Sequence, residues 1–259
     1  MISILAEDKN GNVLARAQGE TEALLCVERV YEPGDRIVFS GSRHLFVKPD
    51  LAVRESEVYL PGETMTWTVP CGEHRLAYCP GAFEQKRHIL SARAMTEEEV
   101  RSRRNIAADP ADLRGDTDFF PHCTANVETR GESCFAARNV IDGLRYNTGH
   151  GEWPFGSWGI GAREDAWCML DFGRPVDTES LTLVLRADFP HDAYWTGGHA
   201  VFSDGSEIAF TLEKTGERQR IPCVRHGIRW IRLERLIKSD DPSAFPALRQ
   251  IEVTGRDSL

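Results

Sequence analysis

Two glycine-rich segments in the second half of the chain contain the side chains best suited to bind a ligand. They cover residues 147–161 and 186–199, and both place aromatic side chains beside histidine, carboxylate or arginine. This mixture suits a sugar, because an aromatic face covers the C–H side of a pyranose while charged groups hydrogen-bond its hydroxyls. The glycines let the backbone turn tightly. We expect ligand contacts from His150, Glu152, Trp153, Trp158, Arg186, Asp188, His191 and Trp195.

The same segments allow catalysis as an alternative. His150 with Glu152 could supply a general acid and a general base. A second set with these functions is Asp188, His191 and Tyr194. A sugar lyase or glycoside hydrolase needs such groups together with one that stabilises developing charge. Sequence spacing does not bring them within bonding distance of one another, so we favour binding without turnover. Tryptophans under long loops can equally be core residues.

The segments that position these loops read mostly as β-strands. Short strand-like runs alternate with turn signals, such as residues 32–35 and 60–62, which is typical of small sandwiches and barrels. Thr96 followed by Glu99 forms a capping box that predicts a short helix. We therefore expect an all-β fold of three parts. They are an N-terminal β-sandwich or barrel domain over residues 1–90, a connector helix over residues 91–103 and a C-terminal β-domain over residues 104–259.

Four short segments in the second domain resemble signatures of the discoidin family, which includes galactose-binding-like modules of glycoside hydrolases. In chain order they are Arg-Asn-Ile-Ala at 104–107, Phe-Ala-Ala-Arg-Asn-Val-Ile-Asp-Gly at 135–143, Trp-Cys-Met-Leu-Asp-Phe-Gly-Arg-Pro-Val at 167–176, and Phe-Pro-Ala-Leu-Arg-Gln-Ile-Glu-Val-Thr-Gly at 245–255. The resemblance implies a jelly-roll β-sandwich of the galactose-binding-like type. It also implies a carbohydrate ligand, which makes a carbohydrate-binding protein our first hypothesis.

The same resemblance implies a structural calcium ion beside the Asp142-Gly turn. Its ligands would be the Asp142 carboxylate, the Leu144 carbonyl and a side-chain oxygen of Asn147 or Thr148, which are hard oxygen donors of the kind calcium prefers. The family's closing glutamate falls at Gln250, so the site would lack one negative charge. The alternative is that Asp142 only caps its own turn by hydrogen bonds.

Charge and composition restrict the partners. A formal net charge of −9 over 259 residues argues against a nucleic-acid interface. No apolar run approaches the ~20 residues of a membrane-spanning helix. The N-terminus does not read as a signal peptide, and the seven cysteines are scattered, so we expect reduced thiols and a cytoplasmic protein. A cytoplasmic location favours the enzyme, or an assembly role as a homo-oligomer. The first domain contains no comparable cluster of functional side chains.

Overall fold

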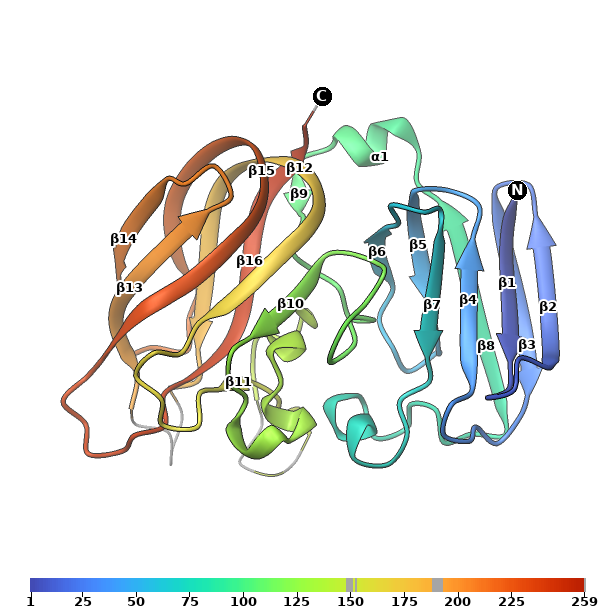
Figure 1. The fold of residues 1–259 in the computed structure, drawn as a ribbon, viewed down its shortest axis with the longest axis horizontal. Helices are drawn as coiled ribbons and strands as arrows, with labels where there is room; N and C mark the ends of the chain where they lie inside the picture. Colours follow the sequence, from blue (N-terminus) through green and yellow to red (C-terminus); the bar gives the residue numbers. More distant parts are fainter. Residues whose placement is uncertain (148–150, 152, 188–192, 259) are drawn as a thin grey trace.

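Alternating apolar and polar residues produce the N-terminal domain in the computed structural model, which describes residues 1–147, 151, 153–187 and 193–258. In strand β3 (Glu22–Glu28) every second side chain is buried, as a strand with one covered face requires. Two four-stranded antiparallel sheets result, in the orders β2-β1-β4-β7 and β3-β8-β5-β6 (Figure 1). Their other strands are β1 (Ile2–Glu7), β2 (Val13–Gly19), β4 (Arg36–Ser40), β5 (His44–Lys48), β6 (Ser56–Tyr59), β7 (Thr64–Thr68) and β8 (Arg87–Ala94).

The two sheets enclose one apolar core, to which Ile4, Phe39 and Trp67 contribute fully buried side chains. The predicted N-terminal β-sandwich is thereby confirmed. A 3-10 helix, η1 (Gly72–Ala77), follows β7 and lies on the side that faces the second domain (Figure 1).

The connector helix α1 (Glu97–Arg101) begins at the predicted capping box. The hydroxyl of Thr96 accepts from the Glu99 amide at 3.2 Å, and the Glu99 carboxylate accepts from the Thr96 amide at 2.9 Å. The helix is shorter than predicted, because residues 91–94 alternate in burial and belong to β8, where they pair with β3 and β5. The first domain therefore extends past residue 90.

The C-terminal domain is a second all-β unit built on two unusually long strands. Its sheet has the order β11-β16-β12-β15-β13-β14, with β10 added to β12 and β9 to β16. The strands are β9 (Arg104–Asn105), β10 (His122–Ala125), β11 (Trp158–Gly159), β12 (Cys168–Leu185), β13 (Trp195–Phe202), β14 (Glu207–Thr211), β15 (Gln219–Lys238) and β16 (Ala247–Asp257). Three 3-10 helices precede β11, namely η2 (Thr129–Gly131), η3 (Ser133–Phe135) and η4 (Ala137–Ile141).

Irregularities in the long strands let this sheet curve around its own core (Figure 1). The pairing of β12 with β15 shifts register between Asp171 and Val176, next to Gly173 at φ +66°. Such bulges bend a strand and increase its twist. The all-β prediction is confirmed for both domains. Among the described residues, no helix is both long and apolar enough to span a bilayer.

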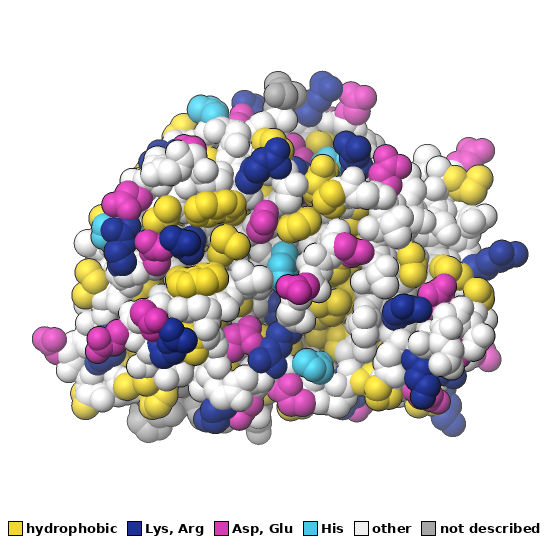
Figure 2. All heavy atoms as spheres, viewed as in Figure 1, with side chains coloured by type: hydrophobic (Ala, Val, Ile, Leu, Met, Phe, Trp, Pro, Cys, Tyr) yellow, Lys and Arg dark blue, Asp and Glu magenta, His cyan; other side chains and the backbone are white. Residues whose placement is uncertain are grey.

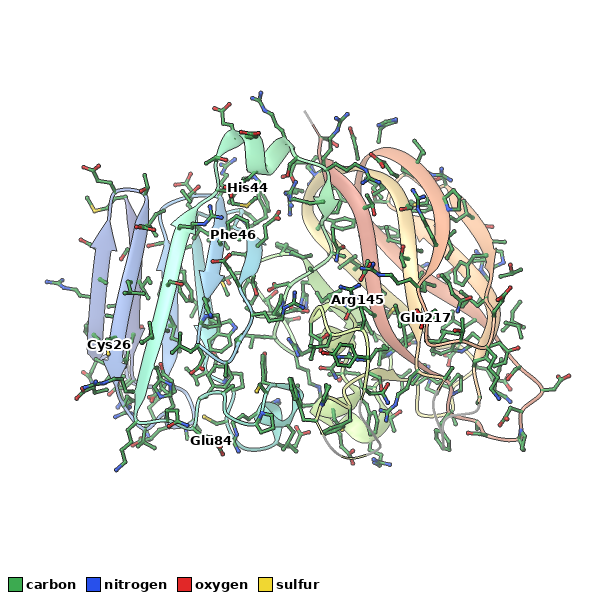
Figure 3. All side chains as sticks on the ribbon, turned by 180° about the vertical axis from the view of Figure 1, so that it is seen from behind. Cys26, His44, Phe46, Glu84, Arg145 and Glu217 are labelled. Atoms are coloured by element: carbon green, nitrogen blue, oxygen red, sulfur yellow. The ribbon has the colours of Figure 1, made fainter. Side chains whose placement is uncertain are left out.

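A network of buried charges joins the two domains around Asp257 of β16. Its carboxylate accepts from Arg174 at 2.6 Å and from Arg104 at 2.8 Å. Arg104 also pairs with Glu57 of β6. His44 of β5 lies below α1 (Figure 3) and its Nε2 is 3.6 Å from Asp257. Burial lowers the pKa of His44 to about 4, although Asp257 opposes this shift. The imidazole is therefore neutral at pH 7 and adds no third cation to the network.

Candidate functional site

The two loops predicted to bind a ligand meet at Arg186, directly after β12. The Arg186 amide donates to the Ala247 carbonyl at 2.9 Å, and its Nη1 donates to the Phe155 carbonyl at 2.6 Å. Its side chain is only 1% exposed. The guanidinium therefore holds the first loop against the start of the second. The side chain is buried in the described structure, and its predicted contact with a ligand stays a prediction.

Trp158 and Trp195 form the buried base of this end of the domain. Trp158 is 0% exposed and Trp195 is 2% exposed, and their ring centroids lie 5.9 Å apart. The indole N–H of Trp158 donates to the Val127 carbonyl at 2.9 Å, which satisfies its one polar atom. Both rings belong to the hydrophobic core of the domain. Both rings are buried, which favours the core alternative for these tryptophans, and their contact with a ligand stays a prediction.

Trp153 and Tyr194 are the remaining described aromatic candidates, and both are partly exposed. Trp153 lines a small hollow of about 80 Å³ at the boundary of the domains, together with Arg54 and Leu144. The backbone amide of Tyr194 is 3.5 Å from the Ser239 hydroxyl. These two side chains retain surface that a ligand can contact. His150, Glu152, Asp188 and His191 lie outside the described residues, so the predicted acid–base groups stay a prediction.

The segment predicted to hold calcium is instead fixed by arginines. The Asp142 carboxylate lies 3.2 Å and 3.3 Å from Nη2 of Arg249, and it also accepts from the Leu144 amide at 2.8 Å. Three residues further along, Arg145 pairs with Glu252 of β16 at 3.3 Å (Figure 3). Both pairs tie this segment to β16. Asn147 ends the described part of the segment, and Thr148 lies beyond it.

These surroundings do not fit calcium. A guanidinium already neutralises the carboxylate that the ion would need, and a second cation beside it would be repelled. The Gln250 amide donates to the Val140 carbonyl at 2.6 Å, while its buried oxygen has no hydrogen-bond partner in the described structure. No group of three or more His, Cys, Asp or Glu that could hold a metal occurs in the described ranges. The turn-capping alternative fits Asp142 better.

A larger cleft of about 400 Å³ lies between the two domains. On the face seen in Figure 1, a hollow separates the domains (Figure 2). The first domain supplies residues 33–34, 68–72, 74 and 77–78 to its wall. The second supplies Ser133, Arg138 and, from the crossing segment 113–116, Leu113, Arg114 and Asp116. Sequence reasoning missed this site and assigned no ligand to the first domain. Its residues come from separate segments, so no local motif reveals it.

Glu73 of η1 contacts the second domain at Ser133, which lines this cleft. Its carboxylate accepts from the Ser133 amide at 2.5 Å and from the Ser133 hydroxyl at 2.7 Å. The same hydroxyl lies 3.4 Å from Nδ1 of His74. Serine, carboxylate and imidazole are the groups of nucleophilic catalysis. However, Ser133 is only 2% exposed and the carboxylate is engaged by its backbone amide. The contact therefore caps η3 and connects the domains.

Arg138 of η4 forms the floor of the cleft and is 2% exposed. Its Nε donates to the Asp112 carbonyl at 2.7 Å and its Nη2 to the Pro110 carbonyl at 2.8 Å. Its Nη1 has longer contacts, at 3.4 Å to the Ala77 carbonyl and 3.2 Å to the Asn139 side chain. No carboxylate lies within ion-pair distance of it among the described residues. The buried guanidinium of Arg138 therefore donates its hydrogen bonds mainly to carbonyl oxygens.

Three buried aspartates lie near Arg138, and each interacts with a different set of groups. Asp142 pairs with Arg249, as described above. Asp112 accepts from the Cys123 amide at 3.1 Å and lies 2.6 Å from Nδ1 of His122. The second oxygen of Asp109 has no hydrogen-bond partner in the described structure. Burial, together with the charge of Asp112, raises the pKa of Asp109 to about 8. The nearby Asp142, Asp112 and Asp109 nonetheless favour the charged form of Arg138 and raise its pKa, against the effect of burial.

Comparison with known proteins gives structural likeness alone. No family model and no curated protein matches the chain. A chitosan-binding module of a Paenibacillus sp. IK-5 chitosanase/glucanase is 16% identical, with a TM-score of 0.41 and coverage of 59% of this chain and 99% of that one. The lectin domain of lectinolysin, complexed with Lewis B antigen, is 17% identical, with a TM-score of 0.43 and coverage of 60% and 98%. A Streptococcus pneumoniae fucose-binding module is 16% identical, with a TM-score of 0.41 and coverage of 62% and 99%.

Proposed function

We propose that the protein binds carbohydrate through the two loops at the end of the C-terminal sandwich. The observation that carries this proposal is the hydrogen bond from Arg186 to the Phe155 carbonyl. It joins two loops that are separate in sequence and that both contain the aromatic, histidine and carboxylate residues suited to sugars. A single ligand can therefore contact both loops.

The aromatic side chains of this region have two roles, because some are buried and others are partly exposed. Trp158 and Trp195 pack in the core beneath the loops and give them a rigid base. Trp153 and Tyr194 keep part of their surface exposed. Trp153 is the described side chain best suited to stack on a pyranose, because an indole offers the largest face and a hydrogen-bond donor at its edge.

The test is a calorimetric titration with sugars chosen from the names of the similar structures, which are chitosan oligosaccharides, Lewis B antigen and fucose. We expect saturable binding to at least one sugar and a loss of about tenfold or more in affinity in Trp153→Ala, given the usual contribution of an aromatic contact. Trp230→Ala is the matched control, since Trp230 is also partly exposed but lies on β15 outside the loops.

Product analysis in the same mixtures separates binding from catalysis. Sugar bound without any cleavage product supports the binding protein. Turnover that disappears in His150→Ala or His191→Ala would establish the enzyme alternative instead. If none of the sugars binds at millimolar concentration, the proposal fails.

A further inference from the structure

The cleft between the domains contains a second arginine with hydrogen-bonding capacity to spare. Arg114 donates from Nε to Glu128 at 2.6 Å and from Nη1 to the Gly131 carbonyl at 2.5 Å. Its Nη2 makes no hydrogen bond within the described part of the chain. Its side chain is 28% exposed and lines the cleft. These two contacts fix the guanidinium plane and leave one nitrogen available.

Two more nitrogens belong to the same cleft. Nη1 of Arg138 has only the two long contacts described above, and His74 is exposed in the wall formed by η1. The Glu73 and Glu128 carboxylates adjoin the lining, where they accept hydrogen bonds from Ser133 and Arg114. The lining itself contributes one carboxylate, Asp116. That side chain is exposed, so water screens its charge more than the charge of the buried Arg138. The described lining is therefore complementary to an anion.

The rest of the wall is mostly apolar and determines what kind of anion fits. Its apolar side chains include Pro33, Val69, Pro70, Ala77 and Leu113, beside the polar groups of Thr68, Tyr78 and Ser133. An inorganic ion would leave these surfaces without a partner. A molecule with one acidic group and an organic body would cover them, and about 400 Å³ is enough for a small molecule.

We propose that the interdomain cleft is a binding site for a small organic carboxylate. The carboxylate accepts hydrogen bonds from the arginine nitrogens, in the pairing that the guanidinium geometry favours. The body of the ligand packs between η1 and the crossing segment 113–116. Both domains supply ligand contacts, so the bound acid also strengthens the contact between them. The lining of this cleft contains no residue of segments 147–161 and 186–199, although the hollow beside Trp153 shares Ala77, Tyr78 and Arg138 with it.

The experiment compares acids with their neutral counterparts by calorimetry on the full chain. The probes are methyl glucuronide against methyl glucoside, galacturonate against galactose, and benzoate against benzyl alcohol. We expect at least one acid to bind tenfold or more tightly than its neutral counterpart. Arg114→Gln should lower the affinity for that acid by about 10- to 100-fold, as expected for a charge-assisted hydrogen bond.

Two further variants keep the result interpretable if Arg114→Gln disturbs Glu128. Arg103→Gln is the matched control, since Arg103 is exposed and does not line the cleft, and we expect unchanged acid binding. Leu113→Trp fills the cleft without removing a charge, and we expect it to abolish acid binding. Unfolding midpoints of all variants identify any that are misfolded.

Three outcomes would overturn the proposal. They are no binding by any acid, equal binding of acids and neutral counterparts, and acid binding that survives Leu113→Trp. The sugar-binding proposal is tested independently, because Trp153→Ala should leave acid binding intact while Leu113→Trp should leave neutral-sugar binding intact. An acid that binds only at the loops would be lost in Trp153→Ala and kept in Leu113→Trp.

Discussion

Replacing Arg249 with methionine tests the view that a guanidinium occupies the place expected for calcium. The substitution keeps an apolar side chain but removes the ion-pair partner of Asp142. Asp142 is only 7% exposed. It also removes the bond from Nη1 to the Asn139 carbonyl at 3.1 Å. Breaking a buried ion pair on one side costs about 3–5 kcal/mol, because the remaining charge is left without compensation.

That cost corresponds to a fall of about 6–20 °C in the unfolding midpoint for a domain of this size. The double variant Asp142→Asn/Arg249→Met should regain most of it, because no buried charge remains. Burial already raises the pKa of Asp142, and Arg249 opposes that shift. Without Arg249 the pKa rises further. The loss in unfolding free energy caused by Arg249→Met should therefore be small at low pH, where the Asp142 carboxyl is protonated. It should grow as the pH rises through the pKa of Asp142.

Urea unfolding followed by circular dichroism from pH 4 to pH 8 measures these differences. Calcium at millimolar concentration should leave the midpoint of the unmodified protein unchanged. Removing the partner of Asp142 should be costly, so a loss in unfolding free energy below about 1 kcal/mol in Arg249→Met would refute this prediction. So would stabilisation of the unmodified protein by calcium.

Two further predictions concern buried groups. Asp109→Asn should become more stable relative to the unmodified protein as the pH rises from 4 to 9. Because the pKa of Asp109 is raised in the folded protein, the carboxyl stabilises the fold fully at pH values below its pKa in the unfolded chain. This stabilisation is lost as the pH rises through about 8. A difference in unfolding free energy between Asp109→Asn and the unmodified protein that stays constant over this range would contradict the prediction. Trp158→Ala should cost about 3–5 kcal/mol in unfolding free energy, as expected for a large core side chain, whereas Trp153→Ala should cost about 1 kcal/mol. Equal costs would show that our division into core and surface tryptophans is wrong.

The strands of the first domain were predictable because their signals are local. The short strand-like runs expected there fall on strands of the structure, and turn residues such as Pro33 and Gly34 separate them. The capping box at Thr96 was likewise predictable from two residues of a single turn. In the second domain the full length of β12 was not apparent from local signals, since a bulge near Gly173 bends this strand without ending it.

The site residues were less predictable because burial depends on the whole fold. The sequence placed Trp153, Trp158 and Trp195 together as loop aromatics, yet two of them lie in the core. Nothing local distinguishes them. The interdomain cleft was missed for a related reason, since Arg114 and Arg138 meet η1 only through packing of the two domains.

Sugar binding at the two loops is best tested by titrating the unmodified protein and Trp153→Ala with the same sugar. We expect saturable binding by the unmodified protein, an affinity at least about tenfold lower in Trp153→Ala, and an unchanged affinity in the Trp230→Ala control. Equal affinity of Trp153→Ala and the unmodified protein would contradict binding at these loops.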